Sequence, residues 1–124
     1  MIIGIGIDII EVDRVAAKVA KENGFREKVF SREEIDFCNN DGRTAESYAA
    51  RFAAKEAFLK ATGRGLTAGH DLCDIVVIND ALGKPGIVLR NSFAALANEN
   101  SWTTIHLSLS HIKAAACAVV VIES

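Results

Sequence analysis

The amino-acid sequence predicts an α+β fold, in which a mostly antiparallel sheet packs against one long central helix and several shorter helices. Residues 45–62 are apolar on nearly every side of a helical wheel, which is typical of a helix buried between other elements. Residues 2–10 and 104–111 alternate in hydropathy as strands do, and residues 82–85 have the turn chemistry of a hairpin. This mixed order of strands and helices, followed by hairpins, favours α+β over a parallel sheet.

Length, charge and cysteine content describe one ordinary globular domain. The chain has 124 residues, 50% of them hydrophobic, so residues 1–124 can form one core but not two. The net charge of −2 provides no general basic field for nucleic acid. The three cysteines show no CxxC spacing, no apolar run approaches the ~20 residues of a membrane span, and the first residues lack a basic leader. We therefore expect a cytoplasmic protein with reduced cysteines and no nucleic-acid or membrane contact.

The first strand, Ile2–Ile10, has two different faces. Four isoleucines on one face alternate with Gly4, Gly6 and Asp8 on the other. Glycines pack little in a strand, and here they are expected to leave the surface clear directly before an acid. Asp8 is therefore predicted to face a ligand. The alternative is a strand-end aspartate that only starts a turn.

The next predicted element is a helix from Arg14 to Asn23, with Asp13 as its N-cap and Gly24 as its stop. Three cations spaced at i, i+4 and i+7 are expected to share an exposed stripe of this helix: Arg14, Lys18 and Lys21. A solvated surface is the usual explanation for such a stripe. Its position just after Asp8 also suits the docking of an acidic partner protein.

The long helix from about Ala45 to Thr62 carries Glu56 and Lys60 on a stripe that also contains Ala49 and Ala53. These small side chains are expected to leave open volume beside the carboxylate. A half-buried acid next to free space suits a metal ion and its waters. The simpler interpretation is an ordinary i, i+4 ion pair between the two charged residues, worth about 0.2–0.5 kcal/mol.

Cap and turn signals place the remaining elements. Ser31 and Glu34 have the spacing of a capping box, which predicts a short helix ending near Cys38. Pro85 fixes a hairpin turn from which Lys84 projects. The later elements are expected at Asp74–Asn79, Gly86–Leu89, Ser92–Ala97, Thr104–His111 and Ala114–Ile122. In the predicted strand Thr104–His111, the alternation places one imidazole and two hydroxyl groups on the same face: His106, Ser108 and Ser110. This face is suited to binding phosphate, or it is simply exposed to solvent.

Two separated acids beside small residues, with lysines and a His/Ser face, indicate magnesium-dependent phosphate chemistry, although the chain has no P-loop. Several motifs occur together in one order and spacing: GIGID followed by a basic helix, FSREE, RFAAKEAFLKA, GKP and HLSLSH. Because these motifs are spread along the chain, it resembles the holo-acyl-carrier-protein synthases over its whole length. These are the short, single-domain class of the 4′-phosphopantetheinyl transferases. The loop 63–70 departs most, because it offers Arg64 and His70 where more glycine and a basic residue near Ala68 are expected.

The resemblance implies a transferase of fatty acid biosynthesis that moves the 4′-phosphopantetheine group of coenzyme A to a serine of apo acyl carrier protein. Adenosine 3′,5′-bisphosphate would be released. It also implies a homotrimer with each site between neighbouring subunits. Asp8 and Glu56 would bind Mg²⁺, which also holds the pyrophosphate of coenzyme A. Lys60 would neutralise the charge that develops on the phosphates.

Other residues receive roles from the same resemblance. His106 would approach the phosphates or the nucleotide, so that the implied catalytic set is Asp8, Glu56, Lys60 and His106. Lys84 and Pro85 would flank the nucleotide. Further coenzyme contacts are expected at Arg51, Ser108 and Ser110. The acidic recognition helix of the carrier protein would meet Arg14, Lys18 and Lys21.

Two alternatives from other classes remain open. GIGID also resembles the first phosphate-binding strand of actin-like sugar kinases, but the chain is far shorter and lacks the Gly-rich hairpin that should follow. A noncatalytic module that binds a carrier protein would keep the basic stripe, but it has no need of Asp8 or Glu56. Incubation with apo carrier protein, coenzyme A and magnesium separates the three, because only the transferase adds mass to the carrier.

Overall fold

The computed structural model describes residues 1–124 and confirms the α+β class. Its elements are, in chain order, β1 (Ile2–Glu11), α1 (Val12–Ala20), α2 (Phe25–Val29), α3 (Arg32–Asn40), α4 (Thr44–Thr62), the 3₁₀ turn η1 (Leu72–Asp74), β2 (Ile75–Asn79), β3 (Pro85–Leu89), α5 (Asn91–Asn100), β4 (Thr104–His111) and β5 (Ala115–Glu123). None of the helices combines the length and hydropathy that crossing a lipid bilayer requires.

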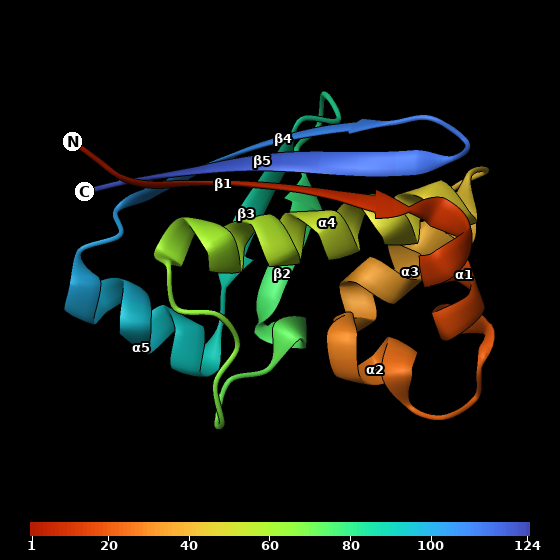
Figure 1. The fold of residues 1–124 in the computed structure, drawn as a ribbon, viewed down its shortest axis with the longest axis horizontal. Coiled ribbons are helices and arrows are strands. Elements are labelled where there is room, and N and C mark those ends of the chain that lie inside the picture. Colours follow the sequence, from red (N-terminus) through yellow and green to blue (C-terminus); the bar gives the residue numbers. More distant parts are fainter.

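The strands form two antiparallel sheets around α4. One sheet has the order β1–β5–β4, and β2 pairs with β3 alone. The pairing of β1 with β5 joins the two ends of the chain, so that Ile7 lies opposite Val119 and Asp8 opposite Ala118. Figure 1 shows the three-stranded sheet lying along one side of α4, with α5 and α2 on the other side and both termini together.

The glycines of β1 let the sheet approach α4 closely. A Cβ atom built on Gly6 would lie 1.9 Å from the carbonyl oxygen of Ala57, and one on Gly4 would lie 1.9 Å from that of Ala61. Neither position can hold a side chain unless the helix moves away. The expectation that these glycines clear a surface for a ligand was therefore wrong. They provide room for the backbone of α4.

The opposite face of β1 is apolar and exposed. Ile5, Ile7 and Ile9 are 63%, 62% and 73% exposed, and the residues paired with them on β5 are only partly buried. Residues directly opposite in an antiparallel pair share a face, so Val119 and Val121 extend the same patch. Monomeric proteins seldom leave a continuous apolar sheet face open to water.

A buried ion pair fixes α4 to α3 and β2. Lys55 and Glu34 are 0% and 1% exposed. Lys55 Nζ donates to Glu34 Oε1 at 2.8 Å, to the Leu72 carbonyl at 3.0 Å and to the Ile75 carbonyl. The other Glu34 oxygen accepts from the Val77 N–H at 3.0 Å. Burial lowers the pKa of Lys55, and the Glu34 carboxylate opposes this effect. These bonds set the position of β2 relative to α4.

The main difference between the predicted and observed helix ends is in α1, which follows β1. The helix α1 begins at Val12 and ends at Ala20, so Asp13 is not its N-cap, and Lys21 lies beyond it with extended backbone. The segment Lys21–Gly24 is exposed and offers no apolar residue that a further turn would bury. Gly24, at φ +88°, precedes α2, a helix that we did not predict.

Other local predictions are confirmed in part. The Ser31 hydroxyl accepts from the Glu34 N–H at 3.2 Å, and Glu34 Oε1 accepts from the Ser31 N–H at 2.9 Å, which forms the expected capping box. The helix α5 runs to Asn100, three residues past the predicted end. All three cysteines are free, but only Cys38 is buried in the core.

Candidate functional site

Lys60 connects the end of α4 to β1. Its Nζ donates to Asp8 Oδ1 at 3.0 Å and to the Ile7 carbonyl at 3.1 Å. The simpler prediction, an ion pair between Lys60 and Glu56, was wrong, because the amine is paired with Asp8 instead. The Asp8 side chain is 15% exposed and that of Lys60 is 57% exposed. The ammonium group therefore remains accessible to a ligand.

Glu56 lies near enough to Asp8 for the two carboxylates to repel each other. Burial raises the pKa of Glu56 above its ordinary value, Asp8 raises it further, and Lys60 and Lys18 oppose both effects. Such a pair of acids is stabilised by a cation placed between or beside them.

These two carboxylates fit the ligand preference of a magnesium ion, but they would supply only part of its coordination shell. No group of three or more His, Cys, Asp or Glu side chains is arranged to hold a metal ion. Asp8 and Glu56 offer the hard oxygen ligands that Mg²⁺ prefers, and Mg²⁺ commonly completes its shell with water and substrate phosphate oxygens. The chemistry of this donor set favours a cation here, because two carboxylate groups, one of them only 15% exposed, lie close together.

The prediction that Ala49 and Ala53 leave free space beside Glu56 was wrong. Ala49 and Ala53 are both 0% exposed and packed into the core. Small residues on this stripe therefore serve close packing, as the glycines of β1 do. Glu56 instead borders a cleft of about 380 Å³ at the C-terminal part of α4 and the loop that follows. We call it the Glu56 cleft, and its lining residues are Glu56, Leu59, Lys60, Gly63, Gly65 and Leu66.

A second pocket, of about 240 Å³, is lined by Arg51 with residues of α3, the β2–β3 hairpin and β4, and we call it the Arg51 pocket. Arg51 is only 4% exposed. Its Nη1 donates to Ser47 Oγ at 3.1 Å and its Nη2 to Asn79 Oδ1 at 2.8 Å, while Nε has no partner. The guanidinium places a positive charge at the wall of this pocket, which suits an anion such as phosphate.

The pocket also contains a histidine that sequence reasoning missed. His111 lines the Arg51 pocket, and its Nδ1 lies 2.7 Å from Glu46 Oε1. The two-residue period that places Leu107 and Leu109 inward also places His111 on the inward face, so this signal was present in the sequence. His106 lies on the opposite face, exposed.

Comparison with known proteins shows which family this chain belongs to. A model of the 4′-phosphopantetheinyl transferase superfamily matches residues 4–120. The chain belongs to the 4′-phosphopantetheinyl transferase superfamily. Because the match covers nearly the whole chain in the transferase fold, the actin-like kinase alternative is excluded.

Individual relatives within the superfamily agree. A holo-[acyl-carrier-protein] synthase of Syntrophus aciditrophicus (strain SB) is 44% identical over 124 residues, which is 99% of this chain and 97% of the relative. The crystal structure of holo-[acyl-carrier-protein] synthase from Neisseria meningitidis matches with a TM-score of 0.91 and 33% identity, covering 100% of both chains. A synthase structure from Bacillus anthracis str. Ames, in complex with CoA (3′,5′-ADP), matches with a TM-score of 0.81 and 38% identity, covering 100% of this chain and 98% of that one.

The other residues predicted to contact coenzyme A do not lie together in this phosphopantetheinyl transferase. Pro85 lines the Arg51 pocket, and Lys84 is exposed on the hairpin turn beside it. His106 pairs with Glu123 on the outer face of the sheet. In the register of β4 with β5, Ser108 and Ser110 share that outer face. The expected His/Ser wall therefore borders the exposed isoleucine patch of the same sheet and does not line the Glu56 cleft of its own chain.

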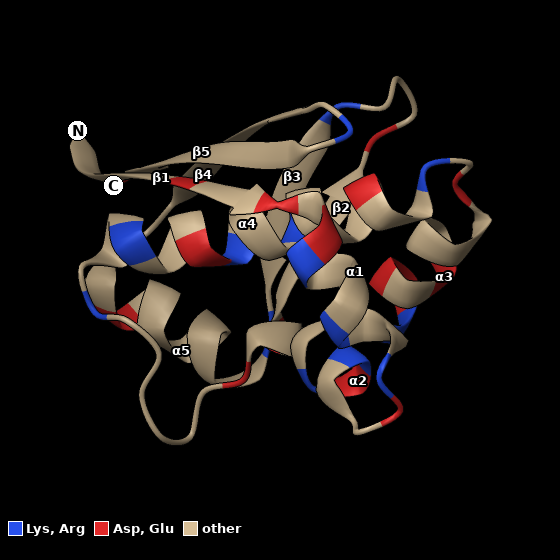
Figure 2. Cartoon of the chain, turned by 45° about the vertical axis from the view of Figure 1, so that its right-hand side comes forward, with Lys and Arg blue, Asp and Glu red and all other residues tan.

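Part of the predicted basic stripe of this transferase lies beside Glu56. Arg14 is exposed on α1, and Lys18 Nζ lies 5.7 Å from the centre of the Phe25 ring. Lys18 is also close enough to Glu56 to lower its pKa. Lys21 follows α1 as an exposed residue with extended backbone, so the prediction that all three cations share one helical stripe was wrong for Lys21. Figure 2 shows the charged segments of α1 next to those of α4.

Glu56→Gln should stabilise the protein at neutral pH when no divalent cation is present. The folded protein holds the Glu56 proton more tightly than the unfolded chain, because its pKa is raised above the ordinary 4.5. Ionised Glu56 therefore costs stability above the raised pKa, and this cost disappears as pH falls through the raised pKa toward the ordinary value. Melting temperatures of both proteins in EDTA, at neutral and at acid pH, measure the effect. A variant that is less stable at neutral pH would contradict it.

Proposed function

We propose that this chain transfers the 4′-phosphopantetheine group of coenzyme A to a serine of apo acyl carrier protein, in a magnesium-dependent reaction of fatty acid biosynthesis. The observation that carries the proposal is that Glu56 and Lys60 line the Glu56 cleft while Lys60 is paired with Asp8. It occurs in a chain that is 44% identical to a holo-[acyl-carrier-protein] synthase.

The residues divide the work of transfer among themselves. The serine hydroxyl loses its proton to the solvent and its oxygen bonds to the phosphorus that carries pantetheine. The bond from that phosphorus to the bridging oxygen breaks, and adenosine 3′,5′-bisphosphate leaves with that oxygen. Asp8 and Glu56 would hold Mg²⁺, which would neutralise charge at the pyrophosphate. Lys60 directs its exposed ammonium to the same phosphates, where a preorganised positive charge stabilises the transition state.

Two features support an assembly in which neighbouring copies share each site, and the family resemblance implies that this assembly is a homotrimer. The exposed isoleucines of β1 form an apolar face suited to contact with another copy. The Arg51 pocket has no lining residue in common with the Glu56 cleft. We infer that the nucleotide lies in the Arg51 pocket of one copy while its pyrophosphate meets Asp8, Glu56 and Lys60 of the next.

The test is a transfer assay with purified protein, apo acyl carrier protein and coenzyme A. Mass spectrometry should find the carrier heavier by one phosphopantetheine group and adenosine 3′,5′-bisphosphate released in equal amount, only when magnesium is present. Tight binding of the carrier without any mass gain would favour the noncatalytic module instead. The free cysteines support a reducing, cytoplasmic setting for this reaction.

Reversing the outer charges of the basic stripe should weaken recognition of the carrier protein alone. An Arg14→Glu/Lys21→Glu variant should raise the KM for acyl carrier protein and leave the KM for coenzyme A nearly unchanged, because exposed charges act mainly on encounter and orientation. Lys18 stays in place because it also interacts with Glu56. Added salt should act in the same direction.

The matched control for this charge reversal is Arg32→Glu/Lys113→Glu, which makes the same change of charge at exposed positions outside the stripe. Steady-state kinetics with each substrate varied in turn compare the two variants. Equal effects of the two variants, or equal loss for both substrates, would mean that the stripe is only a solvated surface.

A further inference from the structure

Asn79, the last residue of β2, joins α4 to the turn between β2 and β3. Its Oδ1 accepts from Arg51 Nη2 at 2.8 Å, and its Nδ2 donates to the Gly83 carbonyl at 3.0 Å. A guanidinium only donates and a carbonyl only accepts, so these partners fix which end of the amide faces which. All three residues line the Arg51 pocket. One side chain therefore connects two walls of that pocket.

The turn itself is held together by Asp80 and not by Asn79. Asp80 Oδ1 accepts from the N–H groups of Leu82 and Lys84, both at 2.9 Å. The Asp80 N–H donates to the Lys84 carbonyl, and the Gly83 N–H donates to the Asp80 carbonyl, again at 2.9 Å. Asp80 thus folds the turn, while Asn79 places the folded turn against α4.

Every side chain that holds the Arg51 guanidinium is uncharged. Besides Asn79, the Ser47 Oγ accepts from Nη1 at 3.1 Å, and the centre of the Phe37 ring lies 4.1 Å from the guanidinium carbon. Asp41 also lines the pocket, but none of the ion pairs in the chain includes Arg51. The positive charge of Arg51 is therefore held in place without being neutralised.

We propose that Asn79 is a positioning residue, which holds Arg51 and the β2–β3 turn in one geometry while leaving the charge of Arg51 available to an anionic nucleotide. The inference rests on the proposed function, in which the nucleotide lies in the Arg51 pocket. Aspartate has the shape of asparagine and also accepts from a guanidinium. Its negative charge, however, would form an ion pair with Arg51 and reduce the attraction of that residue for phosphate. Position 79 therefore requires a neutral acceptor.

Two substitutions of Asn79 should change binding and stability in opposite orders. We expect Asn79→Asp to raise the Kd for adenosine 3′,5′-bisphosphate by about tenfold, because it neutralises Arg51. Asn79→Ala should raise it by about threefold, because it removes two hydrogen bonds but adds no charge. Asn79→Asp should nevertheless have the higher melting temperature of the two, since it keeps a charge-assisted hydrogen bond to Arg51. A purely structural role predicts instead that the less stable variant binds more weakly.

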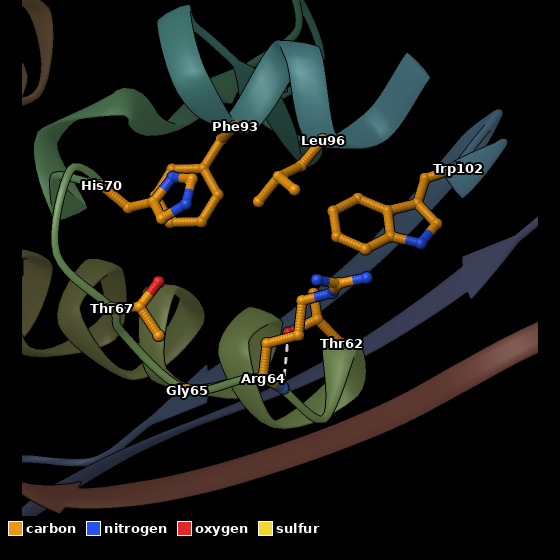
Figure 3. A pocket seen from close by; sticks show the side chains of 8 residues that line it. All are labelled: Thr62, Arg64, Gly65, Thr67, His70, Phe93, Leu96 and Trp102. Carbon is orange, nitrogen blue, oxygen red and sulfur yellow. Dashed lines mark hydrogen bonds between the residues drawn. The ribbon is translucent and has the colours of Figure 1, made fainter. Parts of the chain in front are cut away.

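The matched control is Asn98→Asp, which makes the same change of charge at an exposed position of α5. Figure 3 shows Phe93 and Leu96 of this helix pointing into a different cavity, which has no lining residue in common with the Arg51 pocket. Asn98→Asp should therefore leave the Kd for adenosine 3′,5′-bisphosphate nearly unchanged, because distant exposed charges are screened by salt.

Calorimetric titration of adenosine 3′,5′-bisphosphate into wild type and the three variants, each shown to be folded and in the same oligomeric state, gives the Kd without any transfer step. Thermal unfolding followed by circular dichroism gives the melting temperatures. An Asn79→Asp variant that binds as tightly as wild type, or an Asn79→Ala variant that binds more weakly than Asn79→Asp, would overturn the inference. Absence of transfer by wild type, when the proteins show the predicted binding pattern, would instead contradict only the proposed function.

Discussion

Asp8→Ala and Glu56→Gln should each reduce phosphopantetheine transfer by on the order of 10²–10³-fold while leaving the protein folded. Each variant removes one of the two carboxylates that the structure offers to a metal ion, and no third acid is placed to replace it. Asp8→Ala also frees Lys60 from its partner. The assay is the initial rate of mass gain on apo carrier protein, with circular dichroism to verify folding.

Two controls define this result. Asp13→Ala removes an exposed acid of α1 and should have little effect on transfer. Wild type treated with EDTA should be as inactive as the two variants and should recover when magnesium is added. Full activity of the EDTA-treated protein without added magnesium would contradict the role of both carboxylates.

Lys60→Ala should lower turnover by roughly 10²-fold or more, the effect expected when a preorganised charge is removed from a transition state. Stability should change little, because the Lys60 side chain is 57% exposed and exposed ion pairs contribute little. Turnover and melting temperature are measured on the same preparation. Lys113→Ala, another exposed lysine, is the control. A lower melting temperature with normal turnover would mean that Lys60 only holds β1 against α4.

Local sequence signals predicted most of the elements. The capping box at Ser31 and Glu34, the turn before Pro85 and the alternation in residues 104–111 all depend on neighbouring residues, and the structure contains each of them. The alternation in β1 was also correct, but a period of two residues does not tell which face is buried. Close backbone packing of Gly4 and Gly6 on α4 decided that, and it depends on contacts distant in sequence.

The residues of the candidate site could be predicted where they match a motif. Their interaction partners could not, because these depend on the folded environment. Asp8, Glu56 and Lys60 do lie together. The ion pair of Lys60 with Asp8, however, could not be predicted, because it depends on the contact between β1 and α4. Lys55 stands beside Glu56 in the chain, yet it is buried with Glu34, and no local pattern distinguishes its role. His111 was missed because the motif drew the prediction to His106.

A mixed-variant experiment tests a site shared between copies most directly. One chain carries Asp8→Ala, and the other carries Arg51→Leu/His111→Ala in the Arg51 pocket. Each is first purified alone, shown to be folded and trimeric, and assayed for transfer. The two chains are then produced together with different affinity tags and purified through both tags. If neighbouring copies supply the two halves, the mixed trimers should recover a substantial fraction of wild-type transfer activity that neither variant has alone. Mixed trimers as inactive as the separate variants would contradict the shared site.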